Sequence, residues 1–299
     1  MKTQFFSFLI MLTAAYSLNA QTVIQRNVVP QETLDSAYLK CSYTLHFVVD
    51  PQRPQNVTTE EMALLIGRNV SSFFSYTRFQ HDSLMANLPP EQMTTAILKA
   101  YSNRRSIGSH TYELFKNYPE GQITTTDRIA MNAFKYEEPY ELPEWEIQPE
   151  TKVILGYNCQ KATTSFRGRD YVAWFTPDIP ISNGPWKFAG LPGLILNVAD
   201  TQNHYVFECS GIETPTEKLP ITMRRENYAT VSKSDFNRVY ERFLRDPMGS
   251  INLSGGSGQV TTADGQVVNV QAVGVRRTDT SGSPTSPAST PYNPIELVP

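Results

Sequence analysis

The chain has 299 residues, of which 40% are hydrophobic and 18% are charged, and its formal net charge is −3. With a calculated isoelectric point of about 5.9, it lacks the basic surface that nucleic-acid binding requires, so we exclude a nucleic-acid partner. Cys41, Cys159 and Cys209 are too few for a disulfide scaffold and too widely spaced for a zinc site. We expect them to be small buried hydrophobic residues, and their spacing leaves open whether two of them form one bridge.

Residues 1–20 predict export. Lys2 gives a positively charged start, residues 5–15 are apolar, and Leu18-Asn19-Ala20 is a small-residue cleavage site, which together form a secretory signal peptide. The apolar stretch is too short to span a bilayer, and no later stretch reaches about 18 apolar residues. Gln21 rather than cysteine follows the cleavage site, so we expect export without an acyl anchor. The expected location is the periplasm, with the cell surface or secretion as alternatives.

Residues 21–253 are expected to form a single β-rich domain. Residues 37–49 alternate between two faces and predict a long half-buried strand, with Leu39, Cys41 and Phe47 facing inward. Further strands are predicted at 61–66 and 70–76, paired as a hairpin, and at 112–115, 122–126, 151–166, 171–176, 194–199 and 205–212. The short connections between the last four strands favour an antiparallel meander.

Residues 137–150 form an acidic run in which six glutamates are interleaved with aromatic residues. A calcium cage needs oxygen ligands at fixed short spacing around a glycine turn, and this run has no such loop. We therefore expect a solvated acidic face and no metal site.

Two amphipathic helices are predicted to cover the sheet. The first follows Pro89-Pro90, with apolar residues at helical spacing as far as Tyr101. The second opens with a capping pattern, Ser232 and Asp235, and ends before Pro247.

The sequence changes character after this domain. Residues 254–291 are rich in Gly, Ser, Thr and Pro, which predicts a disordered linker. Within it, Val-rich alternation around Asp264-Gly265 is compatible with a loose hairpin. Residues 292–299 form a short apolar segment, and the sequence leaves open whether it docks on the body.

The hexapeptide at residues 190–195, Gly-Leu-Pro-Gly-Leu-Ile, predicts a turn and the start of a strand. Pro192 presets φ for the second position of a type II turn, and Gly193 accepts the positive φ needed at the third. The leucines and the isoleucine are expected to enter the core. The residues of this structural motif are Gly190, Leu191, Pro192, Gly193, Leu194 and Ile195.

Just upstream, a long loop carries Trp186 between two strands. Loops held by a rigid sheet are frequent sites of function, so this loop and the strand before it are the candidate ligand- or partner-binding surface. Lys187 is expected to be a surface charge, although a lysine beside Trp186 can also contact an anion or a ring. The candidate binding residues are Trp174, Phe175, Pro185, Trp186, Lys187 and Phe188.

Several spaced elements together resemble the GLPGLI family of exported bacterial proteins. They are residues 156–162, 167–169, 173–176, 179–181, 184–188 and 190–195, with 68–75 and 293–297 in support. The resemblance implies an envelope location in Gram-negative bacteria and carries no assigned activity. The strand pattern is also similar to the open half-barrels of lipoprotein-carrier-like proteins. The expected fold class is therefore mainly β (α+β), an antiparallel meander curved into an open half-barrel.

No nucleophile elbow, phosphate loop, metal-spaced histidine pair or Rossmann glycine pattern is present in the sequence, and no cofactor is expected. The leading hypothesis is a non-enzymatic binding or assembly factor. Its partner would be an apolar, lipid-like ligand or an outer-membrane or other envelope protein.

Two alternatives stay open. One is a hydrolase-type enzyme acting on envelope material, with Asp200, His204 or Cys159 providing the chemistry. The other makes residues 292–297 a strand that pairs with the sheet edge of a partner.

Overall fold

The computed structural model describes residues 30–87, 110–130, 132–245, 257–261, 267–271 and 292–298. The predicted signal peptide, the helix expected after Pro89-Pro90 and most of the predicted linker lie outside the described residues. Among the described helices, none is both long and apolar enough to cross a membrane.

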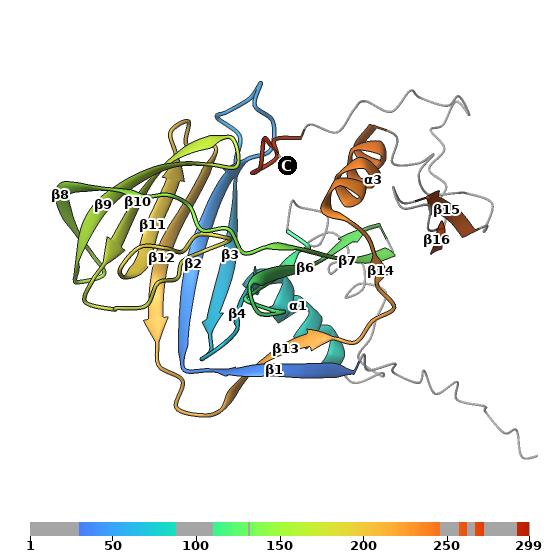
Figure 1. Ribbon diagram of the computed structural model, residues 1–299, viewed down its shortest axis with the longest axis horizontal. Coiled ribbons are helices and arrows are strands. Elements are labelled where there is room, and N and C mark those ends of the chain that lie inside the picture. The colour runs from blue at the N-terminus through green and yellow to red at the C-terminus, as the bar shows by residue number, and fades with distance from the viewer. Residues whose placement is uncertain are drawn as a thin grey trace, which may run out of the picture.

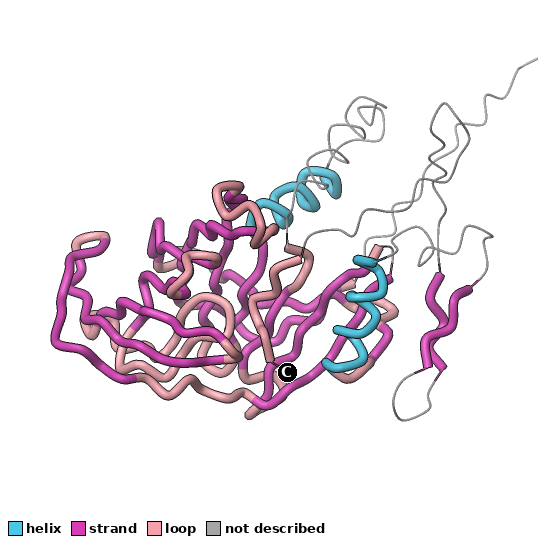
Figure 2. The backbone as a smooth tube through the Cα atoms, turned by 90° about the horizontal axis from the view of Figure 1, so that it is seen from above, coloured by secondary structure: helices cyan, strands magenta, loops and turns pink. Residues whose placement is uncertain are grey.

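A twelve-stranded sheet forms the body of the protein (Figure 1). In spatial order its strands are β14 (Ala229–Thr230), β7 (Asn132–Pro139), β6 (Gln122–Ile129), β5 (Glu113–Lys116), β4 (Ser71–Ser75), β3 (Val57–Ile66), β2 (Leu39–Val48), β12 (Tyr205–Glu213), β11 (Leu194–Asp200), β10 (Arg169–Thr176), β9 (Tyr157–Phe166) and β8 (Glu146–Ile154). Neighbouring strands are antiparallel except for the short β14, which runs parallel to β7. The sheet is curved (Figure 2), and it is open, with β14 and β8 at its two edges. The expected mainly β, antiparallel and unclosed fold is confirmed.

Two meanders make up this sheet, β2 to β7 and β8 to β12, and the pairing of β2 with β12 joins them. Along β2, every second side chain is buried from Leu39 to Phe47, as the alternation predicts. On β12, Tyr205, Phe207 and Cys209 face the same core. The three cysteines are buried and carry free thiols, so none of them forms a bridge.

Residues 151–166 are not one strand, as the sequence predicts, but parts of two. Leu155 and Gly156 both have positive φ, 51° and 83°, and form the tight turn between β8 and β9. A long β-rich run hides such a turn because only Gly156 marks it. The strand β8 lies at an edge, and Pro149 accompanies a break in its register, as is usual for edge strands.

The acidic run is likewise not a solvated face throughout. It covers the end of β7 and the beginning of β8, and Glu138 on β7 is buried. Its carboxylate has cationic partners, Lys187, Lys233 and Arg167, which allows a charge to remain inside.

A two-stranded ribbon, β1 (Gln31–Ala37) with β13 (Leu219–Arg224), extends from the β2–β12 pair across the lower end of the sheet (Figure 1). The sequence reasoning did not predict either strand. Asp35 on β1 accepts hydrogen bonds from the backbone N–H groups of Asn69 and Val70, at 2.7 and 3.0 Å. The ribbon is thereby tied to the turn between β3 and β4.

The second predicted helix is confirmed as α3 (Lys233–Arg245). The hydroxyl of Ser232 accepts the N–H of Asp235 at 3.1 Å, an N-cap. Phe236 packs on Phe134 and Tyr136 of β7. The strands β15 (Ser257–Thr261) and β16 (Val267–Gln271) form the antiparallel hairpin that was compatible with the linker sequence.

A further helix, α1 (Tyr76–Asn87), begins where the sequence predicts only the end of a strand. Its residues show no regular apolar stripe, so periodicity does not indicate it. The local signal is Ser75, whose hydroxyl accepts the N–H of Arg78 at 3.1 Å and caps the first turn.

Candidate functional site

The hexapeptide at 190–195 does not form the predicted type II turn, because positive φ occurs at Gly190 (φ 95°) and not at Gly193. Gly193 is needed for a different reason. A β-carbon there would lie 2.6 Å from the carbonyl carbon of Thr176 and still closer to its oxygen, so only glycine lets the two backbone segments approach. Leu191, Leu194 and Ile195 are buried, as predicted.

The loop before β11 fills the concave side of the sheet with its own side chains. Phe188 is 0% exposed and packs against Tyr171, at 4.8 Å between ring centroids, and against Trp186, at 5.1 Å. The rings of Trp186 and Phe188 belong to the main hydrophobic core together with residues of β2, β3 and β12. The apolar interior that an open half-barrel offers is thus occupied by the chain itself.

The candidate binding residues therefore lie mostly inside the protein. Phe175, Pro185, Trp186, Lys187 and Phe188 are buried. Trp174 is half-buried, and the Nζ atom of Lys152 lies 4.4 Å from its ring centroid. The role of these six residues in binding stays a prediction. The structure shows a packing role for the buried aromatic residues.

Lys187 is not the surface charge that the sequence suggests. It is 2% exposed, pairs with Glu138 and with Glu296, and has its Nζ atom 5.5 Å from the ring centroid of Trp186. A buried ammonium group is tolerated because carboxylates and an aromatic face replace the water it has lost.

Two of the residues proposed for a hydrolase, Asp200 and Cys159, are not assembled into one site. Asp200 accepts hydrogen bonds from Arg169 at 2.8 Å and from the backbone of Tyr205 at 2.9 Å. The pairing registers place Asp200 level with Thr164 on β9. Cys159 lies five residues before Thr164 on β9, which at strand spacing is about 17 Å away. Burial also raises the pKa of the Cys159 thiol, which makes it a poor nucleophile.

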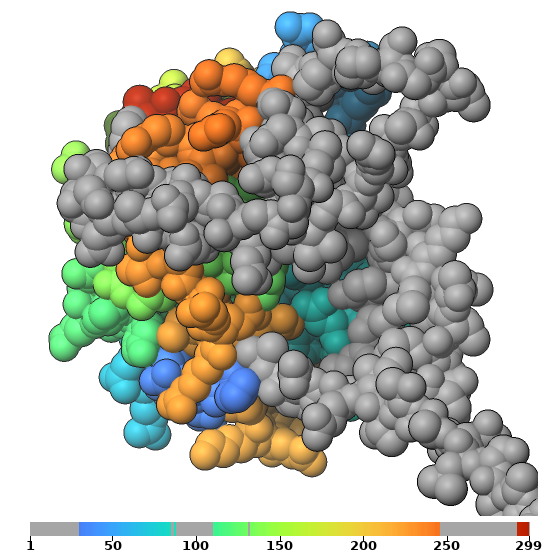
Figure 3. Space-filling view, turned by 90° about the vertical axis from the view of Figure 1, so that its right-hand side faces the viewer, coloured from blue at the N-terminus to red at the C-terminus, as the bar shows by residue number. Residues whose placement is uncertain are grey.

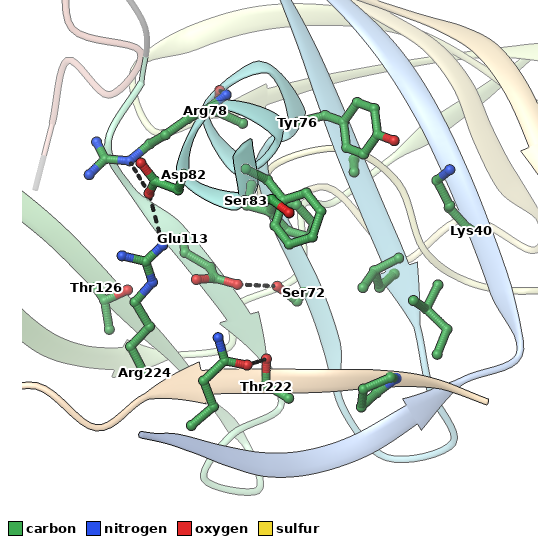
Figure 4. Close-up of a pocket in the computed structure, with 18 of the residues that line it drawn as sticks. Lys40, Ser72, Tyr76, Arg78, Asp82, Ser83, Glu113, Thr126, Thr222 and Arg224 are labelled. Atoms are coloured by element: carbon green, nitrogen blue, oxygen red, sulfur yellow. Dashed lines mark hydrogen bonds and ion pairs between the residues drawn. The ribbon is translucent and has the colours of Figure 1, made fainter. Parts of the chain in front are cut away.

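A cleft of about 860 Å³ lies elsewhere, between α1, the β1–β13 ribbon and the face of β3 to β6 (Figure 4). One part of its lining is apolar and includes Leu65, Phe74, Phe79 and Leu219. Phe79 is 53% exposed. Pockets of this volume, with an apolar wall and a few polar groups, are typical of small-molecule binding sites.

Charged side chains gather at one end of the cleft, where Figure 4 shows Arg78, Asp82 and Arg224 around one another. The Nη2 atom of Arg224 lies 2.8 Å from Oδ2 of Asp82, and Nε of Arg78 lies 3.7 Å from the same oxygen. Burial disfavours the charge on Arg224, but Asp82 and Glu226 outweigh it and raise the pKa of the guanidinium. Lys40 and Tyr76 lie at the other end.

Glu113, on β5 beside this charged end, is one of the titratable groups that line the cleft. Its Oε1 atom accepts a hydrogen bond from the hydroxyl of Ser72 at 3.1 Å. Burial raises the pKa of Glu113 to about 7, against the opposing effects of Ser72, Arg224 and Arg78. A carboxyl group with this pKa can donate or accept a proton near neutral pH.

A carboxylate–histidine pair lies next to the cleft. Oε2 of Glu60 lies 2.7 Å from Nδ1 of His110, and the hydroxyl of Ser75 donates to the same carboxylate. The backbone N–H of His110 also donates to it. In the parts of the chain that the structure describes, no three His, Cys, Asp or Glu side chains are arranged to hold a metal.

Sequence reasoning missed the cleft. Its charged end combines α1, β5 and β13, which are far apart along the chain, and two of these elements were not predicted. The capping serine at position 75 was the available signal for α1.

A family model matches part of the chain. It is described as "Protein of unknown function (Porph_ging)" and covers residues 166–197. These residues span β10, the buried loop and the Gly-Leu-Pro-Gly-Leu-Ile hexapeptide. The match therefore coincides with the packing unit that fills the sheet and not with the cleft. No curated protein matches the chain.

Solved structures are also similar to the chain, and two of them are the following. "Structure of PNGF-II in P21 space group" shows a TM-score of 0.45 and 14% identity, covering 68% of this chain and 32% of that one. "Structure of PNGF-II in C2 space group" shows 0.41 and 15%, covering 65% and 30%. This chain thus spans about a third of the length of the solved structures it matches.

Proposed function

We propose that the protein is an exported, non-enzymatic binding protein whose cleft receives an amphipathic, lipid-like ligand with an anionic headgroup. The signal-peptide sequence supports export, and the resemblance to the GLPGLI family supports a periplasmic or other envelope location. The observation that carries the proposal is the two-part lining of the cleft, with an apolar wall and a charged end.

The apolar wall supports a hydrocarbon or aromatic part of the ligand. Phe79 exposes half of its side chain into a hollow that also presents Leu65 and Leu219. Apolar surface gathered in a concave site is typical of a binding site.

The charged end supports an anionic headgroup. Arg78, Arg128 and Arg224 line it, and Asp82 and Glu226 pair with them. Guanidinium groups bind carboxylates and similar anions through paired hydrogen bonds. When Glu113 is protonated, it adds a hydrogen-bond donor and no negative charge.

The test uses 1-anilinonaphthalene-8-sulfonate, an aromatic anion whose fluorescence rises in apolar sites, and palmitate as its competitor. We expect the wild-type protein to bind the dye and palmitate to displace it. Phe79→Asp should weaken binding about tenfold or more, since burying a phenylalanine side chain is worth roughly 1.5–3 kcal/mol. Arg224→Gln should weaken binding through the loss of a cation.

Leu84→Asp is the matched control, because Leu84 is on the same helix and 61% exposed but does not line the cleft. It should bind the dye as the wild type does. Equal binding by the Phe79→Asp and wild-type proteins would contradict the proposal. Mass spectrometry of lipids extracted from protein purified from the native envelope would then identify the natural ligand.

The raised pKa of Glu113 favours a second candidate function, hydrolysis of an envelope component in the same cleft with Glu113 as general acid or base. Turnover of p-nitrophenyl acyl esters that disappears in Glu113→Gln, while dye binding persists, would support it. Binding without turnover would support the non-enzymatic function.

A further inference from the structure

Residues 292–298 dock on the body of the protein through contacts of their own. Figure 3 shows them beside α3. The nearest described helix in sequence ends at Arg245, and residues 246–291 separate it from Tyr292.

The side chain of Asn293 is recognised at both ends of its amide group. Its Nδ2 atom donates to the backbone oxygen of Val48 at 2.8 Å, and its Oδ1 atom accepts from Nη2 of Arg169 at 2.7 Å. Asn293 is buried. Most other side chains would be disfavoured at this position, because they would leave the backbone oxygen of Val48 and the guanidinium of Arg169 without these hydrogen bonds.

The backbone of the segment is held by a row of donors from the body. Arg169 donates to the carbonyl oxygens of Pro294 and Ile295, at 2.6 and 3.1 Å. The hydroxyl of Tyr205 donates to the carbonyl oxygen of Asn293. Three consecutive carbonyl groups are thus satisfied by the body, which is how extended peptides are commonly bound.

Glu296 is recognised by charge. Its two carboxylate oxygens pair with Lys187, at 2.5 Å, and with Lys233. Burial opposes its ionisation, but the two ammonium groups outweigh this effect and lower the pKa of Glu296 below its ordinary value. Without Glu296, the cations Lys187, Lys233 and Arg167 would outnumber the carboxylates Glu138 and Glu141 that pair with them.

The groups that hold the segment are also fixed by the body. Asp200 pairs with Arg169, whose guanidinium lies 5.2 Å from the ring centroid of Tyr205. Glu138 and the ring of Trp186 hold Lys187. A site whose donors are oriented by other residues is pre-organised for its ligand.

We propose that the surface formed by Arg169, Lys187 and Lys233 is a peptide-binding site that recognises an asparagine and a glutamate three residues apart. The chain's own residues 292–298 occupy it, and the same segment of a second copy can replace them. Between α3 and this segment, the β15–β16 hairpin contributes little length. The residues on either side of it, 246–256 and 272–291, have a contour length of about 100 Å at about 3.3 Å per residue, which is enough to reach a neighbouring molecule.

The test uses a fluorescein-labelled peptide of residues 290–298 and the full chain carrying Asn293→Ala and Glu296→Gln, which weakens the internal occupant. We expect fluorescence anisotropy to show binding to this variant at least about tenfold tighter than to the wild type, whose site is occupied by its own segment at a high effective concentration. The same peptide with both substitutions should bind about tenfold more weakly or worse. Circular dichroism checks that the variant is folded.

A second measurement keeps the segment's sequence native. A specific protease site replaces residues 281–286, and the chain is cut there after folding. The labelled peptide should then displace the cut segment, as followed by size-exclusion chromatography. Retention of the cut segment against 1 mM peptide would overturn the proposal. So would equal binding of the peptide by the wild-type and doubly substituted chains, or no binding by a folded variant.

Discussion

Lys116 and Asn183 connect the two meanders of the sheet. The Nζ atom of Lys116 on β5 lies 2.5 Å from Oδ1 of Asn183, in the loop before β11, and 2.7 Å from the carbonyl oxygen of Gly184. The Nδ2 atom of Asn183 in turn donates to the hydroxyl of Ser71 at 2.7 Å. The buried loop is therefore tied by polar groups to the half of the sheet from which it does not come.

This lysine predicts a dependence of stability on pH. Lys116 is 1% exposed, and burial lowers its pKa to about 7. The ordinary pKa of a lysine is 10.5. Between pH 7 and 10.5, therefore, Lys116 binds more protons in the unfolded chain than in the folded one, and the free energy of unfolding rises with pH. Lys116→Met should remove that rise in urea unfolding measured at pH 7 and 9.5.

Lys161→Met is the control, because Lys161 is a partly exposed lysine that pairs with Glu150 at the surface. It should keep the wild-type slope. An unchanged slope in Lys116→Met would show that Lys116 stays charged in the folded protein.

Gly193 predicts a second outcome. Gly193→Ala should destabilise the protein by about 3 kcal/mol, since its β-carbon would meet the rigid backbone of Thr176. Gly211→Ala is the control, because the nearest atom to a β-carbon there is at 4.0 Å and Gly211 has no positive φ. Equal unfolding midpoints for the two variants would contradict the role assigned to Gly193.

Glu296 predicts that acid releases the docked segment. Its pKa lies below the ordinary value of 4.5, so its ion pairs add stability above that pH, and this stability is lost as the pH falls through the folded-state pKa. Glu296→Gln should reproduce the release at neutral pH. Hydrogen exchange at the N–H of Leu297, which donates to the carbonyl oxygen of Arg167 at 2.9 Å, provides the measurement.

Glu213→Gln serves as its comparison, because Glu213 forms an exposed pair with Lys40. Exchange at Leu297 should remain slow in that protein. Slow exchange in Glu296→Gln as well would mean that the hydrogen bonds of Arg169 suffice to hold the segment.

Glu113 predicts that dye binding in the cleft weakens as the pH rises through about 7. Deprotonation adds a negative charge beside the site of an anionic headgroup, and the pKa of Glu113 is about 7. Glu113→Gln should bind the dye with an affinity that changes little between pH 6 and 8. Glu208→Gln, which alters an exposed carboxylate on β12, should keep the pH dependence of the wild type.

Strand alternation predicted much of the sheet, because a half-buried strand shows its two faces directly in sequence. The β2 and β12 strands are examples. The turn at Leu155 and Gly156 was not predicted, because its residues lie within a continuous β-rich run. The helix α1 was not predicted because it lacks an apolar stripe. The helix α3 was predicted because it has both an apolar stripe and an N-cap.

The candidate sites were harder to predict, for a physical reason. Trp186 and Lys187 look like loop residues exposed to solvent, and nothing local shows that the loop folds back into the sheet. Lys187 is paired with Glu138 and Glu296, which lie 49 and 109 residues away from it along the chain. Such contacts depend on the complete fold, as does the charged end of the cleft.

The position of β2 has a consequence for how the chain is made. Its residues are among the first of the body to be synthesised, yet one of its two neighbours, β12, follows more than 150 residues later. Until then β2 has an unpaired edge, and an unpaired apolar edge invites association with other chains. Folding of the nascent protein should therefore be slow, and it should depend on factors that shield this strand until β12 has been synthesised.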